Sequence, residues 1–189
     1  MRNVGYNEFE KILAFHSSPA MLGVKPASLF SVTDTESVGE SISRFNRKAA
    51  VKGLKIRELC CLKNRRLLLM YNEKVLERHM NNEKVLRMFG KFGYDEDMTT
   101  QQRIDRLAEK IVGSGDFPHE IGLFLGYPVE DIQGFIDNKG ENYLLCGYWK
   151  VYSDEERAKR IFNSYNKCRS YMIGKLNSGV DIYKALRIS

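Results

Sequence analysis

The sequence lacks the long hydrophobic runs and the motifs by which many proteins can be classified at once. No stretch approaches the roughly 18 apolar residues of a membrane span. The first residues, MRNVGYNEFEKILAF, mix acids with apolar side chains as a signal peptide does not. The phosphate loops G-x-x-x-x-G-K-[ST] and G-x-G-x-x-G and the serine elbow G-x-S-x-G are also missing. We therefore expect a cytoplasmic protein with no membrane partner and no nucleotide loop.

The composition contains no low-complexity tract and no long polar linker. The chain has 189 residues, of which 43% are hydrophobic and 29% charged, as in soluble globular proteins. A chain of this length can bury a core that needs neither a disulfide nor a metal to hold it together. We expect a single domain that spans residues 1–189.

The four cysteines do not form a metal-binding pattern. No C-x-x-C pair is present, and Cys60 and Cys61, adjacent on an expected strand, should point to opposite faces. In the cytoplasm we expect free thiols. A metal site would need distant residues to converge, and its candidate ligands are His16, His119 and Cys146. No cofactor can be assigned from these residues.

The pattern of apolar residues predicts an α+β fold. Residues 54–62 and 65–71 predict a β-hairpin joined through Lys63 and Asn64, with its second, nearly continuous apolar arm central in the sheet. Ser153 should cap the longest helix, which ends before Gly179, and Pro19 should end the first one. The sum is a small, mostly antiparallel sheet of three or four strands packed with about seven helices. Further strands are predicted at 27–32 and 143–152, and further helices at 6–16, 37–51, 73–80, 82–92 and 100–112.

Residues 119–138 predict a helix-turn-helix-like hairpin. Gly122, Gly126 and Ile132 have the spacing of the small, turn and core positions of that motif. Its second helix, however, should present Glu130 and Asp131 to solvent, and residues 111–148 hold six acids against one lysine. A helix that repels phosphate is a poor reader of DNA. We interpret the hairpin mainly as a packing element.

Positive charge gathers elsewhere in the chain, whose net charge is +6. Residues 44–66 hold nine Lys or Arg and one acid, Glu58. Nucleic-acid binding through this region is one alternative. The other is protection of a strand edge from aggregation, because no aromatic side chains are interleaved to stack on bases. The candidate nucleic-acid residues are Lys55, Arg57, Arg65 and Arg66.

The residues HEIG at 119–122 suggest a catalytic histidine without a known motif. A zinc protease would need a second histidine where Leu123 stands. His119 and Glu120 directly follow Pro118, and they could act as a general base and its orienting acid. Alternatively, His119 caps or packs against the start of a helix.

Three stretches together resemble a known family. They are HSSPAMLGVKPASLF at 16–30, FPHEIGLFLGYPVEDIQGFI at 117–136 and GYWKVYSDEERAKRIFNSYNKCR at 147–169. They are similar to the bacterial family called domain of unknown function 3793, over nearly the whole chain. The resemblance implies a cytoplasmic single-domain protein of anaerobic Firmicutes, linked to redox or iron physiology but without an assigned reaction. The family tends to have Cys where this chain has Ser17 and Tyr148, whereas Cys168 matches. A thiol site that needs those two positions is therefore disfavoured.

The polar residues within these stretches suggest a binding site. His16, Lys25, His119, Glu120 and Lys150 would together form a cationic site with one acid, which suits a small anionic ligand. We therefore expect a binding or regulatory protein with a small-anion or protein-partner site around the His119 motif. The alternatives are an enzyme that uses His119 and Glu120 as acid and base, and nucleic-acid binding through residues 44–66. The predicted ligand-binding residues are His16, Lys25, Trp149 and Lys150, next to His119 and Glu120.

Overall fold

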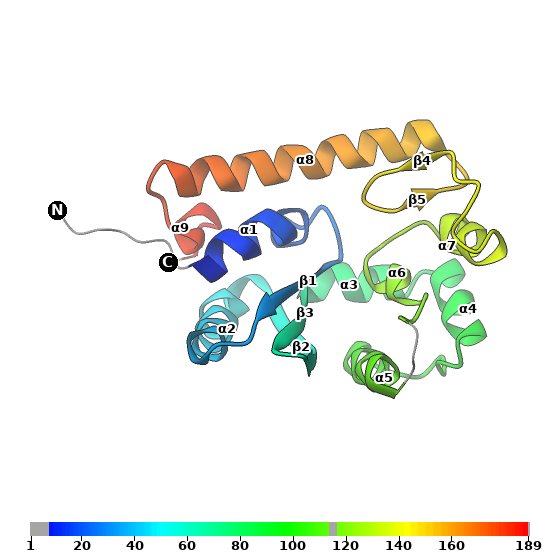
Figure 1. Cartoon of the computed structure of the whole chain (residues 1–189), viewed down its shortest axis with the longest axis horizontal. Helices are drawn as coiled ribbons and strands as arrows, with labels where there is room; N and C mark the ends of the chain where they lie inside the picture. Colours follow the sequence, from blue (N-terminus) through cyan, green and yellow to red (C-terminus); the bar gives the residue numbers. More distant parts are fainter. Residues whose placement is uncertain (1–7, 114–116, 189) are drawn as a thin grey trace. The chain divides into compact units, whose positions relative to one another are not determined.

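The structure, a computed structural model, describes residues 8–113 and 117–188, which divide into two compact units. Unit 1 consists of residues 8–73 and 165–188, and unit 2 of residues 74–113 and 117–164. The long helix α8 (Glu155–Asn177) starts in unit 2 and continues into unit 1 (Figure 1). Each unit contains its own set of buried hydrophobic side chains. Within the described residues, no helix combines the length and the hydrophobicity needed to cross a bilayer.

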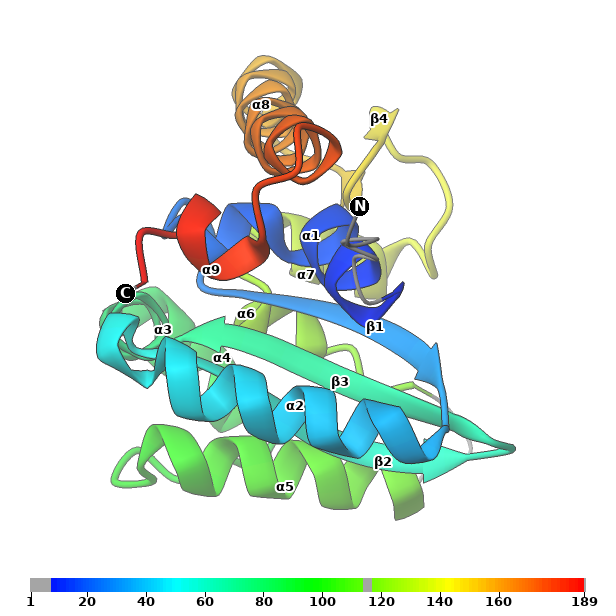
Figure 2. The ribbon, with the colours of Figure 1, turned by 90° about the vertical axis from the view of Figure 1, so that its left-hand side faces the viewer.

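Unit 1 is built around a three-stranded antiparallel sheet of order β1–β3–β2 (Figure 2). The turn between the last two strands has positive φ at both Lys63 and Asn64, 47° and 61°, as in the type I′ turns that match strand twist. The central strand contains Leu68 and Leu69, both fully buried. The α+β class, the hairpin and the central place of its second arm are thus confirmed. The strands are β1 (Ala27–Thr33), β2 (Leu54–Leu62) and β3 (Arg65–Asn72).

Helix α1 (Glu8–Met21) continues through Pro19, so the prediction that this proline ends the helix was wrong. Proline has no N–H, and it therefore leaves the carbonyl of Phe15, four residues earlier, without its helical donor. The Nε of Arg169 donates to this carbonyl at 2.9 Å, and its guanidinium carbon lies 4.4 Å from the centre of the Phe15 ring. A donor 154 residues away thus replaces the hydrogen bond that the proline removes.

Helix α2 (Glu36–Ala49) and the 3₁₀ turn η1 (Ala50–Lys52) end at Gly53, which has the predicted left-handed conformation, with φ of 65°. On α2, the side-chain amide of Asn46 bonds both backbone groups of Ile56 in β2. Its Nδ2 donates to the carbonyl at 2.9 Å, and its Oδ1 accepts the N–H at 2.7 Å. Asn46 therefore occupies part of the outer edge of β2, which would otherwise be open to another strand.

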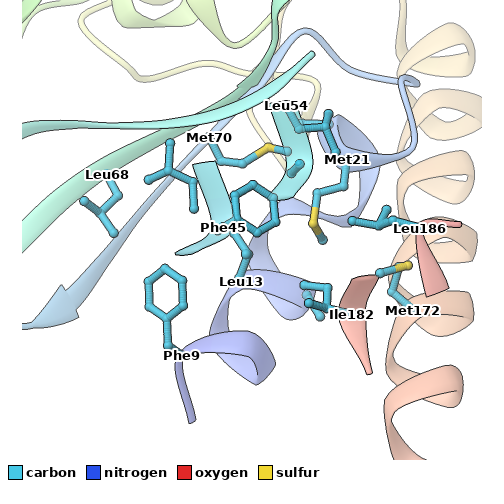
Figure 3. Packing of buried hydrophobic residues seen from close by; sticks show 14 of the residues in the cluster. Phe9, Leu13, Met21, Phe45, Leu54, Leu68, Met70, Met172, Ile182 and Leu186 are labelled. Atoms are coloured by element: carbon cyan, nitrogen blue, oxygen red, sulfur yellow. The ribbon is translucent and has the colours of Figure 1, made fainter. Parts of the chain in front are cut away.

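The core of unit 1 lies on one face of this sheet, to which alternate residues of each strand point. Leu68 and Met70 of β3 belong to the same cluster as Leu13 of α1 and Phe45 of α2 (Figure 3). Phe30 of β1 is also a member of this cluster. The later part of α8 and the short helix α9 (Ile182–Ala185) complete the cluster. They contribute Met172, Leu176, Ile182 and Ala185, and Leu186 follows directly after α9.

Unit 2 is mainly helical. Phe89 is fully buried, with its ring centroid 5.2 Å from that of Phe124 and 5.1 Å from that of Tyr94. The predicted helices between residues 73 and 112 are confirmed. The helices are α3 (Glu73–Met80), whose first residue belongs to unit 1, α4 (Glu83–Lys91), α5 (Thr100–Gly113), α6 (Ile121–Phe124) and α7 (Val129–Asp137). A hairpin of β4 (Leu145–Cys146) and β5 (Lys150–Val151) leads into α8.

This hairpin and the start of α8 differ from the prediction. Residues 143–152 do not form one strand, because the chain turns back at Gly147. A Cβ on Gly147 would overlap the Phe162 ring, so this close approach favours glycine. At the start of α8, the carboxylate of Asp154 accepts the N–H of Arg157. Ser153, the predicted cap, instead donates its hydroxyl to Asp131.

The predicted helical hairpin at 119–138 consists of α6 and α7, with Gly126 between them at φ of 74°. A Cβ on Gly122 would lie 3.0 Å from the Ile132 side chain, so the small residue allows the two helices to pack closely. The first helix has only four residues. The similarity of the whole hairpin to a DNA-reading motif stays a prediction.

Candidate functional site

One buried carboxylate, that of Asp131, holds α7 to the start of α8. Its Oδ2 accepts the indole Nε1–H of Trp149 at 2.7 Å. Its Oδ1 accepts the backbone N–H of Tyr152 and of Ser153, both at 2.9 Å, and the Ser153 hydroxyl at 2.8 Å. The residue is only 3% exposed, so the prediction that it faces solvent was wrong. A buried carboxylate is costly unless it is hydrogen-bonded, and these four donors meet that requirement.

A pocket of about 480 Å³ opens beside this network in unit 2. Its volume lies in the range of small-molecule sites, and its walls are mainly apolar, as is usual for such sites. Asp131 lines it, but its two oxygens are already engaged. The side chains that remain for a ligand are His119 and Lys150. The main apolar walls are Phe117, Ile121, Tyr127, Ile132, Phe135 and Trp149.

Lys150 places a positive charge at this pocket. Its Nζ donates to the Gly140 carbonyl at 2.7 Å and lies 4.9 Å from the centre of the Tyr143 ring. Among the described residues, no carboxylate forms an ion pair with it. Two aromatic faces and a carbonyl hold the ammonium group without neutralising it. The charge can therefore still attract an anion.

The imidazole of His119 lies at the exposed part of the pocket lining. Its ring meets the Phe135 ring at 63°, with 5.4 Å between the centroids. In the described part of the chain, it has no hydrogen-bonding partner. Both ring nitrogens can thus face a ligand. The structure brings together three predicted site residues in this pocket: His119, Trp149 and Lys150.

Glu120 does not line this pocket. Its carboxylate is 3% exposed and accepts the Lys110 Nζ at 2.6 Å and the Tyr94 hydroxyl at 3.4 Å. Lys110 also donates to the Phe92 carbonyl at 2.8 Å. Burial, and then the neighbouring Glu120, raise the pKa of Tyr94. The predicted acid partner of His119 is thus a buried carboxylate that is ion-paired with the partly exposed Lys110.

The other two predicted ligand-binding residues belong to unit 1. His16 stacks on Phe30, with 6.1 Å between the ring centroids, and burial and the charge of Arg169 lower its pKa. Lys25 is 5% exposed, and its Nζ lies 5.5 Å from the centre of the Tyr165 ring. Burial lowers the pKa of Lys25 to about 8. The predicted set of anion-binding residues is therefore divided between the two units.

The buried Lys25 predicts a rise in stability at alkaline pH. Because its pKa is lower in the folded protein than in the unfolded chain, folding disfavours its protonated form. This cost is full below pH of about 8 and disappears as the pH approaches 10.5. A pKa that falls from 10.5 to about 8 corresponds to about 3 kcal/mol. Lys25→Met removes this cost at every pH. The difference in unfolding free energy between Lys25→Met and wild type should therefore fall by about 3 kcal/mol as the pH rises from about 8 to 10.5.

The measurement is urea unfolding of wild type and Lys25→Met at a series of pH values. Other groups titrate equally in both proteins, so the difference between them isolates the lysine. The exposed Lys11 of the same unit provides the control, because Lys11→Met should follow the wild-type pH dependence. Parallel curves for wild type and Lys25→Met would contradict the prediction.

The three predicted metal ligands do not all lie in one unit. His16 belongs to unit 1, whereas His119 and Cys146 belong to unit 2. Within residues 8–113 and 117–188, no three His, Cys, Asp or Glu side chains are grouped so as to hold a metal ion. All four cysteines are free thiols in the structure.

Three of the four basic residues of the nucleic-acid alternative bond to neighbouring side chains of unit 1. Lys55 pairs with Glu73 at 2.6 Å. Arg66 pairs with Asp34 at 2.6 Å and with Glu58 at 2.9 Å. Arg65 donates to the Ser31 hydroxyl at 2.6 Å, and Arg57 lies on the edge strand β2. These contacts tie the strands of the hairpin to their surroundings.

Several residues that build the pocket were not predicted as site residues. They include the aromatic Phe117, Tyr127 and Phe135. Their aromatic side chains were visible, but aromatic residues at helical spacing are more often core than pocket wall. Asp131 carried one usable signal, since an acid between the apolar Val129 and Ile132 can lie on the buried side of a helix.

Comparison with known proteins identifies a family but no activity. The family model described as "Protein of unknown function (DUF3793)" matches residues 13–186. The match covers nearly the whole chain, and the chain therefore belongs to this family. No curated protein and no solved structure matches it.

Proposed function

We propose that this member of the DUF3793 family is a binding protein whose pocket in unit 2 holds a small apolar molecule with an anionic group. The observation that carries the proposal is the lining of the pocket. Its aromatic and aliphatic walls enclose about 480 Å³, and its one lysine has no carboxylate partner among the described residues. Apolar walls provide affinity by removing hydrophobic surface from water, and a few polar groups orient the ligand.

The two polar side chains have separate roles in this proposal. Lys150 attracts the anionic group by charge, and His119 donates a hydrogen bond to it from the exposed side. Asp131 does not contact the ligand directly. Its hydrogen bond to Trp149 fixes the indole as one wall of the pocket. Glu120 has no part in the site, because it is paired with Lys110.

Trp149 makes the proposal directly testable, because it is the single tryptophan of the chain and lines the pocket. The probes are aromatic carboxylates such as benzoate, each compared with its neutral amide. We expect each carboxylate that binds to change the tryptophan fluorescence and to bind at least about tenfold more tightly than its amide. Lys150→Met should remove this preference, and His119→Phe should weaken carboxylate binding while it keeps the aromatic contact.

The matched control is Lys139→Met, which removes the same charge from a nearby residue outside the pocket lining. It should leave carboxylate binding unchanged. The proposal fails if amides bind as tightly as carboxylates, or if Lys139→Met and Lys150→Met have equal effects. It also fails if none of the carboxylates changes the fluorescence of Trp149.

A further inference from the structure

A second pocket, in unit 1, has no role in the function proposed above. It encloses about 360 Å³ where the end of α1, the turn η1, the end of β3, α8 and the residues after α9 meet. All of its lining residues belong to unit 1. None of them was a predicted site residue, so this pocket is independent of the one around Trp149.

The lining of this pocket carries two positive charges and no acid. Lys52 comes from the end of η1, and Arg187 follows α9. Within the described part of the chain, neither side chain forms an ion pair with a carboxylate or donates a hydrogen bond. Tyr171, which is 44% exposed, adds a phenol from α8. The side chains that line the pocket therefore carry a net positive charge.

Part of the remaining wall of the pocket is apolar. Met21, Leu54 and Leu186 line the pocket and also belong to the hydrophobic core of unit 1 (Figure 3). Their exposed fractions are all below a tenth. The two cationic side chains thus lie beside buried members of the core of unit 1. A ligand with a small organic part could rest against these side chains.

The backbone at Arg187 allows the role of its side chain to be separated from folding. Its φ is 55°, in the left-handed region that glycine adopts most easily. Its N–H donates to the Lys184 carbonyl at 3.0 Å, and the next N–H, of Ile188, donates to the Tyr183 carbonyl at 2.9 Å. This is the usual closing geometry of a helix, in which glycine is the favoured residue. The backbone conformation alone does not account for an arginine at this position.

We propose that this pocket binds a small phosphate-bearing molecule through Lys52 and Arg187. A phosphate monoester carries a charge between about −1.5 and −2 at neutral pH, which matches two cations without an acid. The guanidinium of Arg187 can offer two parallel N–H groups to phosphate oxygens, whereas Lys52 acts as a point charge. The organic part of the ligand then lies against Leu54 and Leu186.

The test uses the full chain with inorganic phosphate and phenyl phosphate as probes, and with chloride and acetate at equal ionic strength as controls. Binding is measured by titration calorimetry and by the change in melting temperature. We expect both phosphates, but neither control anion, to bind and to raise the melting temperature. Phenyl phosphate should bind more tightly than inorganic phosphate, because it adds contact with the apolar base. If inorganic phosphate bound more tightly than phenyl phosphate, the site would take the free anion, and the proposal of an organic ligand would be overturned.

Arg187→Gly separates binding from folding. Because glycine suits the left-handed backbone, this variant should melt at the same temperature as wild type or higher, yet bind phosphate at least about tenfold more weakly. Lys52→Gln should weaken binding to a similar degree. Lys139→Gly is the matched control, since Lys139 also has a left-handed backbone, with φ of 52°, but does not line this pocket. It should keep phosphate binding unchanged.

Three results would overturn the proposal. Phosphate could have no greater effect than chloride, acetate could bind as tightly as phosphate, or Arg187→Gly could bind phosphate as wild type does. In each case the two cations would not form a phosphate site. None of these results depends on the Trp149 pocket, so the two proposals can fail separately.

Discussion

Replacing Asp131 by alanine is expected to destabilise the protein by about 4 kcal/mol. The change removes the acceptor of four hydrogen bonds and leaves their donors inside a largely buried region. Each buried donor without a partner costs about 1 to 3 kcal/mol, although water can reach some of them. The change also leaves a cavity where the carboxylate was. We therefore expect one of the largest effects of any single substitution in unit 2.

The measurement is urea unfolding followed by the fluorescence of Trp149, which is itself one of the four donors. Asp131→Asn should have a smaller effect of about 2 kcal/mol. Its remaining oxygen can still accept from Tyr152 and Ser153, but its NH₂ group would face the indole N–H, and both are donors. In the folded variant, the emission of Trp149 should shift, because its hydrogen bond is lost.

Asp137→Asn provides the control for this prediction. Asp137 lies on the same helix but is exposed, and it accepts a hydrogen bond only from the neighbouring Gln133 side chain among the described residues. Its replacement should change the stability by less than about 0.5 kcal/mol. If Asp131→Ala unfolded at nearly the same urea concentration as Asp137→Asn, the buried network would not stabilise the fold as we describe.

Gly134→Ala is expected to have an effect of similar size, about 4 kcal/mol, for a steric reason. Gly134 lies within α7, where a Cβ would stand 2.5 Å from the Cβ and 2.6 Å from the Cγ of Tyr152. Rotation of a side chain cannot relieve this clash, because the Cβ of Tyr152 is fixed by its backbone. That backbone is in turn held by its hydrogen bond to Asp131. Helix α7 and the backbone at Tyr152, which follows β5, would have to move apart.

Gly90→Ala is the matched control, because it makes the same change in a helix of the same unit. Nothing lies within 4 Å of a Cβ placed on Gly90 in α4. Alanine favours the helical conformation over glycine, so this variant should gain up to about 1 kcal/mol. Chemical unfolding of the two variants should therefore give changes of opposite sign. Two stabilising changes would show that α7 does not approach Tyr152 as closely as the structure indicates.

Much of the fold follows from local sequence. The hairpin of β2 and β3 was predicted because Lys63 and Asn64 separate two apolar arms, and short-range turn geometry determines such a hairpin. The helices between residues 73 and 112 follow from apolar spacing, which reports the buried face of a helix. Near neighbours in the chain dominate these elements, so near neighbours were enough to predict them.

The errors occurred where a distant residue supplies the decisive contact. Helix α1 continues through Pro19, and Arg169 donates a hydrogen bond to the Phe15 carbonyl, which the proline leaves without its helical donor. Ser153 is not the cap of α8 because Asp131 takes its hydroxyl. The predicted strand at 143–152 turns back at Gly147, where Phe162 closely approaches the backbone. A local pattern contains no information about such partners.

The same division applies to function. By itself, the sequence determined the α+β class, the family, and three of the residues around the pocket: His119, Trp149 and Lys150. Only the tertiary structure decided that Glu120 is paired with Lys110, that Asp131 is buried, and that aromatic side chains form a wall. The physical reason is that composition and periodicity reveal which residues are apolar or charged. A binding site depends on which of them meet, and the packing of residues distant in sequence decides this.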